Sequence, residues 1–497
     1  MKALKKIFII CLATGAFASC KKQLLDINVD PNNPTTASAS PDLVLANALN
    51  TTAGIYDNSV AGNNNFVWAG LWMGHIGYSG NYAIATENIS YNLTNSFAAG
   101  TWDNIYDNIE DYDFVEKKGV EAKNSFYRAI GILMKAYNFQ TLVDLYNNVP
   151  YTEALQGTAN SRPKFDNGKD IYVDLAKKMD TAIALFKISG STTIGGDIMF
   201  NGDATKWTKF ANTVKLRLLL QQSEVNGAAA KAQAAALTGG FLTTDAVVNP
   251  GYLNSSGKMN PFWGSNYNTA GTYTQTLYRA GAFAINTMKA LNDTVRLKYF
   301  YTPIGGITDS SLSKYNGNFF GDQGVPNSGT SQIGAGVLKN YNQGAVIMLA
   351  AESYFLQAEA VLRGWITISG ETAQSLYEKG VTASFKYLGL TAAQAATYYS
   401  QPGNKNTTWA ATSGFQEQLA LIIRQKWIAE TWINELVPYN DYRRLHLPAD
   451  IPLSTSPYST GIFPARLMYP QREISVNGEN VSAQGNITPG TKVWWMP

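Results

Sequence analysis

Apolar residues recur at spacings of three and four along much of the chain, which is the period of an α-helix packed against a core. Phe126, Ile130 and Leu133 begin the clearest series, which predicts a helix that runs to about Tyr146. These helical segments make the predicted fold class mainly α. The same period predicts helices over residues 41–49, 101–118, 169–187, 204–222, 347–362, 371–388 and 415–436.

Between these segments lie long stretches that are rich in Gly, Asn, Ser and Tyr: 54–100, 249–278, 301–344 and 450–497. Loops of more than about 15 residues are uncommon in compact domains and are often functional. We therefore expect a helical scaffold that carries long irregular loops with a few short strands. No linker divides the chain after residue 40, so residues 41–497 are predicted to form a single domain.

Residues 1–19 have the pattern of a secretory signal peptide. Three lysines precede an apolar run over residues 7–17, which is too short to span a bilayer, because a spanning helix needs about 20 residues. Small residues stand directly before Cys20 and resemble a bacterial lipobox. We expect cleavage before Cys20 and acylation of its thiol, which would anchor the chain to a membrane through lipid.

Residues 20–40 are predicted to form a tether between this anchor and the domain. Asp30, Pro31, Asn32 and Pro34 are typical of the segment, and proline interrupts both helices and strand ladders. Its Asp and Asn residues lack the spacing of a known calcium loop, so we assign them to local turns instead.

The mature chain is predicted to carry no net charge. The full chain has 39 Lys and Arg against 36 Asp and Glu, and the excess equals the three lysines of the signal peptide. A nucleic acid partner is therefore not expected, because such binding needs a basic face. Of the two cysteines, Cys11 lies in the cleaved segment, so an intrachain disulfide is excluded as well.

Aromatic residues make up 12% of the chain and charged residues only 15%. Tyr and Trp offer a flat apolar face with a polar edge, which suits an uncharged, extended ligand such as a chain of pyranose rings. We take the candidate ligand-binding residues from three aromatic-rich loops, the first of which contains four glycines that permit turns. The candidates are Trp68, Trp72, His75, Tyr78 and Tyr82 in the first loop, Trp263, Tyr267 and Tyr273 in the second, and Tyr315 and Phe319 in the third.

The first loop also admits a purely structural interpretation. Phe66, Trp68, Leu71 and Trp72 follow a helical spacing, which is equally typical of rings buried in a core. The spacing alone leaves both interpretations open for these side chains.

A glycoside hydrolase is the main alternative, since it would need two carboxylates across a cleft. Glu352 and Glu359 are seven residues apart and so share one helix face, but apolar residues surround them. A carboxylate in such surroundings needs a cationic partner. We expect structural ion pairs with arginine here, for which Arg424, Arg443 and Arg444 are candidates.

Other enzyme classes find little support in the sequence. His75 and His446 are the only histidines, and the chain has neither a Gly-x-Ser-x-Gly elbow nor a His-Glu-x-x-His zinc helix. We therefore predict no catalytic residue, no metal site and no cofactor.

Several stretches occur in an order and spacing that extend over nearly the whole mature chain. They are DINVDPN at 26–32, TWDNIY at 101–106, YNFQTLVDLY at 137–146 with VPY at 149–151, AESYFLQAEA at 351–360, RQKWIA at 424–429 with YRR at 442–444, and PARLMYP at 464–470. Together they resemble the SusD/RagB family, in particular its SusD-like branch of starch-binding-associated outer-membrane lipoproteins.

The resemblance implies a SusD-like helical scaffold with tetratricopeptide-like helix pairs. It also implies a non-catalytic role in nutrient uptake, in which the protein captures a glycan and delivers it to a SusC-type TonB-dependent outer-membrane transporter. A peptide-binding member of the family and a structural transporter subunit remain alternatives. We expect a lipid-anchored protein of the outer membrane that faces the cell surface, although Lys21 and Lys22 depart from the acidic residues that often follow the cysteine in this group.

Overall fold

The computed structural model describes residues 39–497 except 58–65, 84, 191–193, 307–310 and 323. The protein is mainly helical, with 53% of the described residues in helix and only short strands among them, which confirms the predicted fold class. The predicted signal peptide, Cys20 and all but the last two residues of the predicted tether lie outside the described residues.

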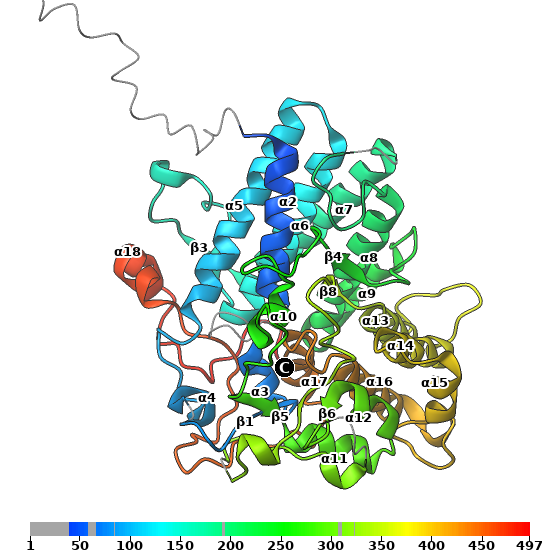
Figure 1. Ribbon diagram of the computed structural model, residues 1–497. Helices are drawn as coiled ribbons and strands as arrows, with labels where there is room; N and C mark the ends of the chain where they lie inside the picture. Colours follow the sequence, from blue (N-terminus) through cyan, green and yellow to red (C-terminus); the bar gives the residue numbers. More distant parts are fainter. Residues whose placement is uncertain (1–38, 58–65, 84, 191–193, 307–310, 323) are drawn as a thin grey trace, which may run out of the picture.

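Five long helices form the first half of the scaffold. They pack in sequence, α2 on α5, α5 on α6, α6 on α7 and α7 on α8, and occupy the upper half of the molecule (Figure 1). Their bounds are α2 (Pro41–Tyr56), α5 (Ala99–Glu121), α6 (Ser125–Tyr146), α7 (Gly168–Ser189) and α8 (Ala204–Gln221).

Polar residues fix where three of these helices begin. The Asn124 side chain accepts hydrogen bonds from the amides of Phe126 and Tyr127 and so caps α6. Asn167 caps α7 and Asp203 caps α8 in the same way. Each cap satisfies an amide that has no partner within the helix, which is worth about 1 kcal/mol.

A second group of helices lies at the lower right in Figure 1. Helix α13 packs on α14 and α16, and α14 also packs on α15. This group comprises α13 (Ala350–Leu362), α14 (Ala373–Tyr387), α15 (Ala392–Tyr399), α16 (Gly414–Ala429) and α17 (Leu436–Leu445).

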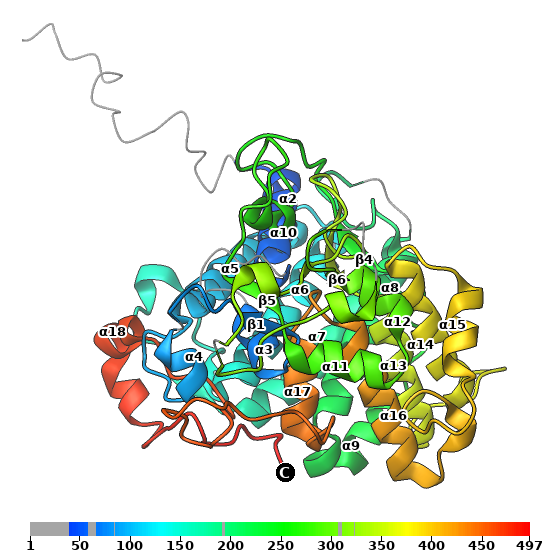
Figure 2. The same ribbon diagram turned by 60° about the horizontal axis from the view of Figure 1, so that its bottom comes forward.

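The described strands form four antiparallel pairs that tie distant loops together. β1 (Ile76–Tyr78) pairs with β5 (Tyr278–Ala280), and the two lie side by side below α10 in both ribbon views (Figures 1 and 2). The other pairs are β2 (Val149–Pro150) with β3 (Phe165–Asp166), β4 (Ala246–Val248) with β8 (Ala345–Met348), and β6 (Tyr301–Thr302) with β7 (Gln332–Ile333).

Shorter helices complete the described structure. The α-helices are α3 (Val67–Trp72), α4 (Thr86–Ser90), α9 (Ser223–Ala235), α10 (Pro261–Asn266), α11 (Ala282–Ala290), α12 (Thr294–Phe300) and α18 (Gln471–Ser482). The 3₁₀ turns are η2 (Gly157–Ala159), η3 (Leu312–Lys314), η4 (Asn327–Gly329) and η5 (Trp409–Ala411).

The helices predicted from apolar period are present, with three errors at their ends. The first helix, predicted over 41–49, continues to Tyr56. Residues 347–348 belong to strand β8, because a short run of buried apolar residues looks alike in a strand and in a helix. The helix predicted over 415–436 stops at Ala429, and Trp432 adopts a left-handed φ of 61° before α17 begins. Several helices of the predicted loops, such as α18, were not predicted at all.

Buried ion pairs hold the second group of helices together and join it to the first. Arg444 on α17 holds both carboxylate oxygens of Glu359 on α13, at 2.6 and 2.8 Å. Glu352, two turns away on the same face of α13, pairs with Arg217 of α8 in the first group at 3.4 Å. The predicted partnership with Arg444 is therefore confirmed. The other two predicted arginines bind elsewhere, Arg424 to Asp450 and Arg443 to backbone carbonyls.

Candidate functional site

Half of the sequence-predicted ligand residues lie in the protein core. Their side chains are buried, so they offer no surface to a ligand, and we withdraw them from the candidate site. They are Trp68, Trp72, His75, Tyr78 and Tyr315, each no more than 4% exposed.

Trp68 and Trp72 are core residues, as the structural interpretation of their helical spacing expects. Both lie on α3, with ring centroids 4.6 Å apart, and the Trp72 indole nitrogen donates to the Asn88 carbonyl at 3.0 Å. Gly70 between them is needed for close packing, since a β-carbon there would approach the Glu435 side chain to 2.8 Å. This glycine brings the helix into the core and does not turn rings outward, which corrects the expectation from the loop composition.

His75 and Tyr78 make contacts typical of buried core residues. The His75 ring is hydrogen-bonded to the Glu435 carboxylate at 2.6 Å and lies against the indole of Trp427. The Tyr78 hydroxyl accepts a hydrogen bond from Asn88 at 2.6 Å. Burial raises the pKa of Tyr78, so its hydroxyl stays protonated.

The three aromatic-rich loops nevertheless meet on one side of the molecule. The β1–β5 pair joins the first loop to the second, and the Tyr82 hydroxyl is hydrogen-bonded to that of Thr276 at 2.5 Å. The third loop joins through Asn318, whose amide donates to the Tyr78 carbonyl at 2.7 Å, and through the Asn327 amide, which donates to Asn81 at 2.6 Å.

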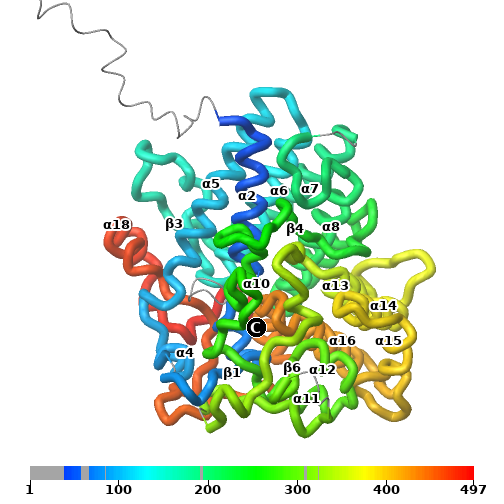
Figure 3. Tube along the Cα trace, in the orientation of Figure 1, coloured from blue at the N-terminus to red at the C-terminus, as the bar shows by residue number. Residues whose placement is uncertain are grey.

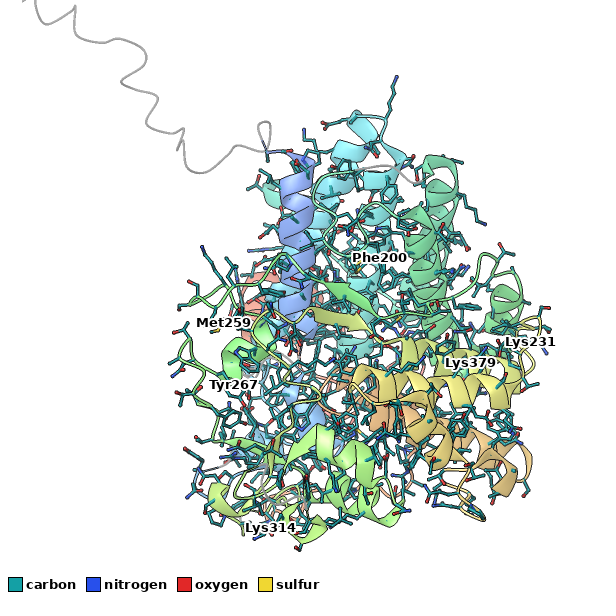
Figure 4. All side chains as sticks on the ribbon, turned by 45° about the vertical axis from the view of Figure 1, so that its right-hand side comes forward. Phe200, Lys231, Met259, Tyr267, Lys314 and Lys379 are labelled. Atoms are coloured by element: carbon teal, nitrogen blue, oxygen red, sulfur yellow. The ribbon has the colours of Figure 1, made fainter. Side chains whose placement is uncertain are left out.

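Four candidates lie on this side, and together we call them the aromatic surface: Trp263, Tyr267 and Tyr273, whose rings are in contact, and Tyr82, which is linked to the same loop through Thr276. The Trp263 and Tyr267 rings stack with centroids 4.1 Å apart and planes at 11°. Tyr273 meets Tyr267 edge to face at 5.1 Å. Tyr82 is 41% exposed, and the other three rings are half-buried. Figure 4 shows Tyr267 at the edge of the molecule.

The local sequence explains how the stacked pair is held. Asn260 caps α10 by accepting from the Trp263 amide at 2.9 Å, and Pro261 occupies the first helical position, where no amide donor is needed. The Asn260 amide donates to Asp57 at the end of α2, at 3.1 Å. The trace in Figure 3 shows α10 against the lower end of α2. Trp263 on this short helix and Tyr267, the residue that directly follows it, therefore stack on a segment that is held against α2.

Phe319 is 46% exposed on the third loop, but no ring contact joins it to the aromatic surface among the described residues. The amide of Asn81 and that of Asn268 are exposed beside the surface. The carbonyl oxygen of Asn81 accepts from the Asn327 amide of the third loop, and that of Asn268 holds a local turn. Their NH₂ groups are the donors that this surface could offer to ligand hydroxyls.

Arg279 is a residue of this site that sequence reasoning missed. It lies on β5, is 3% exposed, and its guanidinium is 5.6 Å from the centroid of the Tyr273 ring. Burial lowers the pKa of Arg279, although the nearby phenols of Tyr273 and Tyr82 oppose this effect. The one signal for Arg279 in the sequence is that a cationic residue stands inside a short run of aromatic and apolar residues.

The carboxylates on α13 are not placed for catalysis. Glu352 and Glu359 are both fully buried, and the cavity beside Glu352 has a volume of about 30 Å³, which admits a water molecule and no sugar. Burial alone would raise the pKa of Glu359, but the cationic side chains of Arg444 and Arg363 hold it at about 2. This pair is therefore a structural charge cluster.

Two further properties of the described residues bear on the site. None of the helices combines the length and apolar character that crossing a membrane requires. No group of three or more His, Cys, Asp or Glu side chains in this part of the chain is arranged to hold a metal ion. A groove of about 460 Å³ between α5, α6 and α7 contains none of the predicted ligand residues.

Comparison with known proteins gives one consistent result. The model of a SusD-like family, described as starch-binding and associating with the outer membrane, matches residues 31–470. No curated protein matches the chain in sequence.

Solved structures of SusD homologues have the same fold. A SusD-like protein from Bacteroides thetaiotaomicron is 24% identical, with a TM-score of 0.74 over 91% of this chain and 98% of its own. A chitin-binding SusD homologue from Flavobacterium johnsoniae is also 24% identical, with a TM-score of 0.76 over 92% and 98%. A third structure, described as a chitin-binding protein, is 26% identical, with a TM-score of 0.75 over 92% and 100%.

Proposed function

Because the chain belongs to the SusD-like family of starch-binding, outer-membrane-associated proteins, we propose that it captures a glycan on its aromatic surface without cleaving it. The stacked pair Trp263 and Tyr267 is the observation that supports this proposal most directly. Flat, half-exposed rings on a rigid base match the apolar faces of pyranose rings, and neighbouring amides can bind the hydroxyls. Two relatives of similar fold are described as chitin-binding.

The open form of the site fits binding better than catalysis. The aromatic surface contains no carboxylate, and the segment 246–292 that supplies most of it has no Asp or Glu at all. A glycosidase needs two carboxyl groups about 5–10 Å apart on either side of the scissile bond. An aromatic surface without acids holds a polymer and leaves its bonds intact.

The finer parts of the proposal concern location and partner. We propose that Cys20 is acylated, that the anchored protein faces the cell surface, and that it delivers its ligand to a SusC-type TonB-dependent transporter. Anchoring keeps the local concentration of the binding site high, so modest affinity with fast release is sufficient. Mass spectrometry of the mature N-terminus, protease treatment of intact cells and co-purification with a transporter test these three points separately.

The binding proposal is tested with the full-length chain purified in detergent. Retention is measured on starch and chitin, together with a panel of soluble plant and microbial glycans by affinity electrophoresis. We expect retention of at least one glycan and no change in its chain length after long incubation. Shortened polymer would contradict the proposal in favour of a hydrolase. Retention of a peptide pool alone would favour peptide capture, and no retention at all would favour a structural subunit.

A further inference from the structure

The other buried arginines of the described residues are held by carboxylates or, like Arg443, by backbone carbonyls, whereas Arg279 has no anionic partner among them. Arg296 pairs with Asp293 at 2.5 Å, and Arg444 pairs with Glu359 and Asp441. Arg279 is 3% exposed, yet no carboxylate of the described residues lies within ion-pair distance of it. Its Nε and Nη1 atoms also lack a hydrogen-bond partner in that part of the chain.

The location of Arg279 connects this cation to the aromatic surface. On the β1–β5 pair it stands opposite Gly77, so no side chain faces it across the strands. Its guanidinium lies by the Tyr273 ring, and Tyr82 is close enough to influence its charge. The guanidinium with the unpaired donors therefore lies beside Tyr273, one of the four rings of the aromatic surface.

An unpaired buried cation is costly. Removing a guanidinium from water is unfavourable unless an anion compensates its charge, and a single cation–π contact offsets only part of that loss of hydration. Within residues 246–292 the charged side chains are Lys258, Arg279 and Lys289, and there is no acid. The charge missing from the site is thus a negative one, and the protein does not supply it locally.

We propose that the ligand of the aromatic surface is an acidic glycan, whose uronic acid carboxylate pairs with Arg279 while a neighbouring sugar stacks on Trp263 and Tyr267. This inference rests on the proposed function and specifies its ligand class. A planar carboxylate matches the guanidinium and can accept two hydrogen bonds from it. The stacked rings favour a sugar polymer over an acidic peptide as the bearer of that carboxylate.

Access to Arg279 requires one side-chain movement. Tyr82 is the exposed ring beside the guanidinium, and it is held to the second loop by the hydrogen bond to Thr276. Rotation of an exposed tyrosine is fast, on a timescale of picoseconds to nanoseconds. We infer that Tyr82 turns aside when the carboxylate enters.

The test uses polygalacturonate, alginate and hyaluronate, each compared with its carboxyl-reduced, neutral form. Full-length protein is titrated with each polymer by calorimetry at low and moderate salt. We expect at least one acidic polymer to bind tenfold or more tightly than its reduced form. Arg279→Gln should bring the two within about twofold, and Arg279→Lys should restore part of the preference. Lys231→Gln removes an exposed cation far from Tyr267 in Figure 4 and should change nothing.

Each contrary outcome has its own meaning. Equal binding of acidic and reduced polymers, or a preference that survives Arg279→Gln, overturns the inference and leaves glycan capture intact. Binding of neutral glycans alone also overturns the inference and leaves glycan capture intact. Binding of an acidic peptide and of no glycan overturns both proposals. The Arg279→Gln variant should melt at or above the wild-type temperature, because it removes an unpaired buried charge, so lost binding will not reflect lost folding.

Discussion

The indole of Trp263 stacks on the ring of Tyr267, with centroids 4.1 Å apart and planes at 11°. Trp263 lies on α10 and Tyr267 directly follows this helix, whose capping residue Asn260 is hydrogen-bonded to Asp57 at the end of α2, so both loop aromatics are held against the scaffold. This arrangement separates rings that can meet a ligand from the many that only fill the core.

Alanine variants of Tyr82 and Tyr78 test this distinction between ligand-facing and core rings directly. Tyr82 is 41% exposed and Tyr78 is 4% exposed, although only three residues lie between their positions. Tyr82→Ala should weaken glycan retention and cost less than about 0.5 kcal/mol of stability. Tyr78→Ala should cost about 3 kcal/mol, since it empties a buried site. Affinity electrophoresis and denaturant unfolding give the two quantities.

Phe415→Ala provides the matched control for Tyr82. Its side chain is 37% exposed on α16, at a distance from α10 in both ribbon views. It should change neither binding nor stability appreciably. Unchanged retention in Tyr82→Ala, or equal losses in both variants, would show that exposure in this loop has no bearing on the ligand.

Alanine substitutions at Gly70 and Gly54 are expected to change the stability of the protein in opposite directions. A β-carbon on Gly70 would meet Ile76 at 2.6 Å and Glu435 at 2.8 Å, so Gly70→Ala should destabilise the protein by about 1–3 kcal/mol. Gly54 lies in α2 with nothing within 4 Å, so Gly54→Ala should stabilise by about 0.5–1 kcal/mol. Thermal melting of both variants checks the signs. A neutral Gly70→Ala would mean that α3 can move away from Glu435.

The sequence predicted the scaffold well because its helices are long and buried on a regular face. Helices α5, α6, α7 and α8 all appear within two or three residues of the predicted ends. Helix α18 was missed because only Asn477 of its residues is buried, so the apolar period that marks other helices is absent.

The candidate site was only partly predictable, for a physical reason. A tryptophan in a glycine-rich loop has the same local sequence whether it faces solvent or the core, and Trp72 faces the core because α3 packs under Tyr439. Arg279 could not be predicted either, because only the folded structure shows that this buried guanidinium has no carboxylate beside it. Whether the remaining candidates bind a ligand stays a prediction.

The buried Glu359 predicts a specific dependence of stability on pH. Its pKa falls from an ordinary value of 4.5 to about 2 in the folded protein. A lowered carboxyl pKa means that the stabilisation is complete above pH 4.5 and is lost as the pH falls toward 2. Glu359→Gln should therefore cost about 3 kcal/mol at pH 7, because it leaves Arg444 short of a partner, and progressively less below pH 4.5.

Denaturant unfolding at pH 7, 5 and 3 measures this difference. Glu371→Gln is the control, because it removes a carboxylate whose partner Lys379 is exposed to solvent. Surface pairs of that kind contribute about 1 kcal/mol or less. A Glu359→Gln deficit that stays constant from pH 7 to pH 3 would argue against the ionised Glu359–Arg444 pair as its source.

The most direct test of glycan capture is calorimetric titration of wild-type protein and Trp263→Ala with the glycan that the panel identifies. Loss of one stacking face should weaken binding about tenfold, or about 1.4 kcal/mol, with the melting temperature nearly unchanged because the ring is half-exposed. Equal affinity of the two proteins would contradict a role for the aromatic surface, and a wild-type protein that binds no glycan would contradict capture itself.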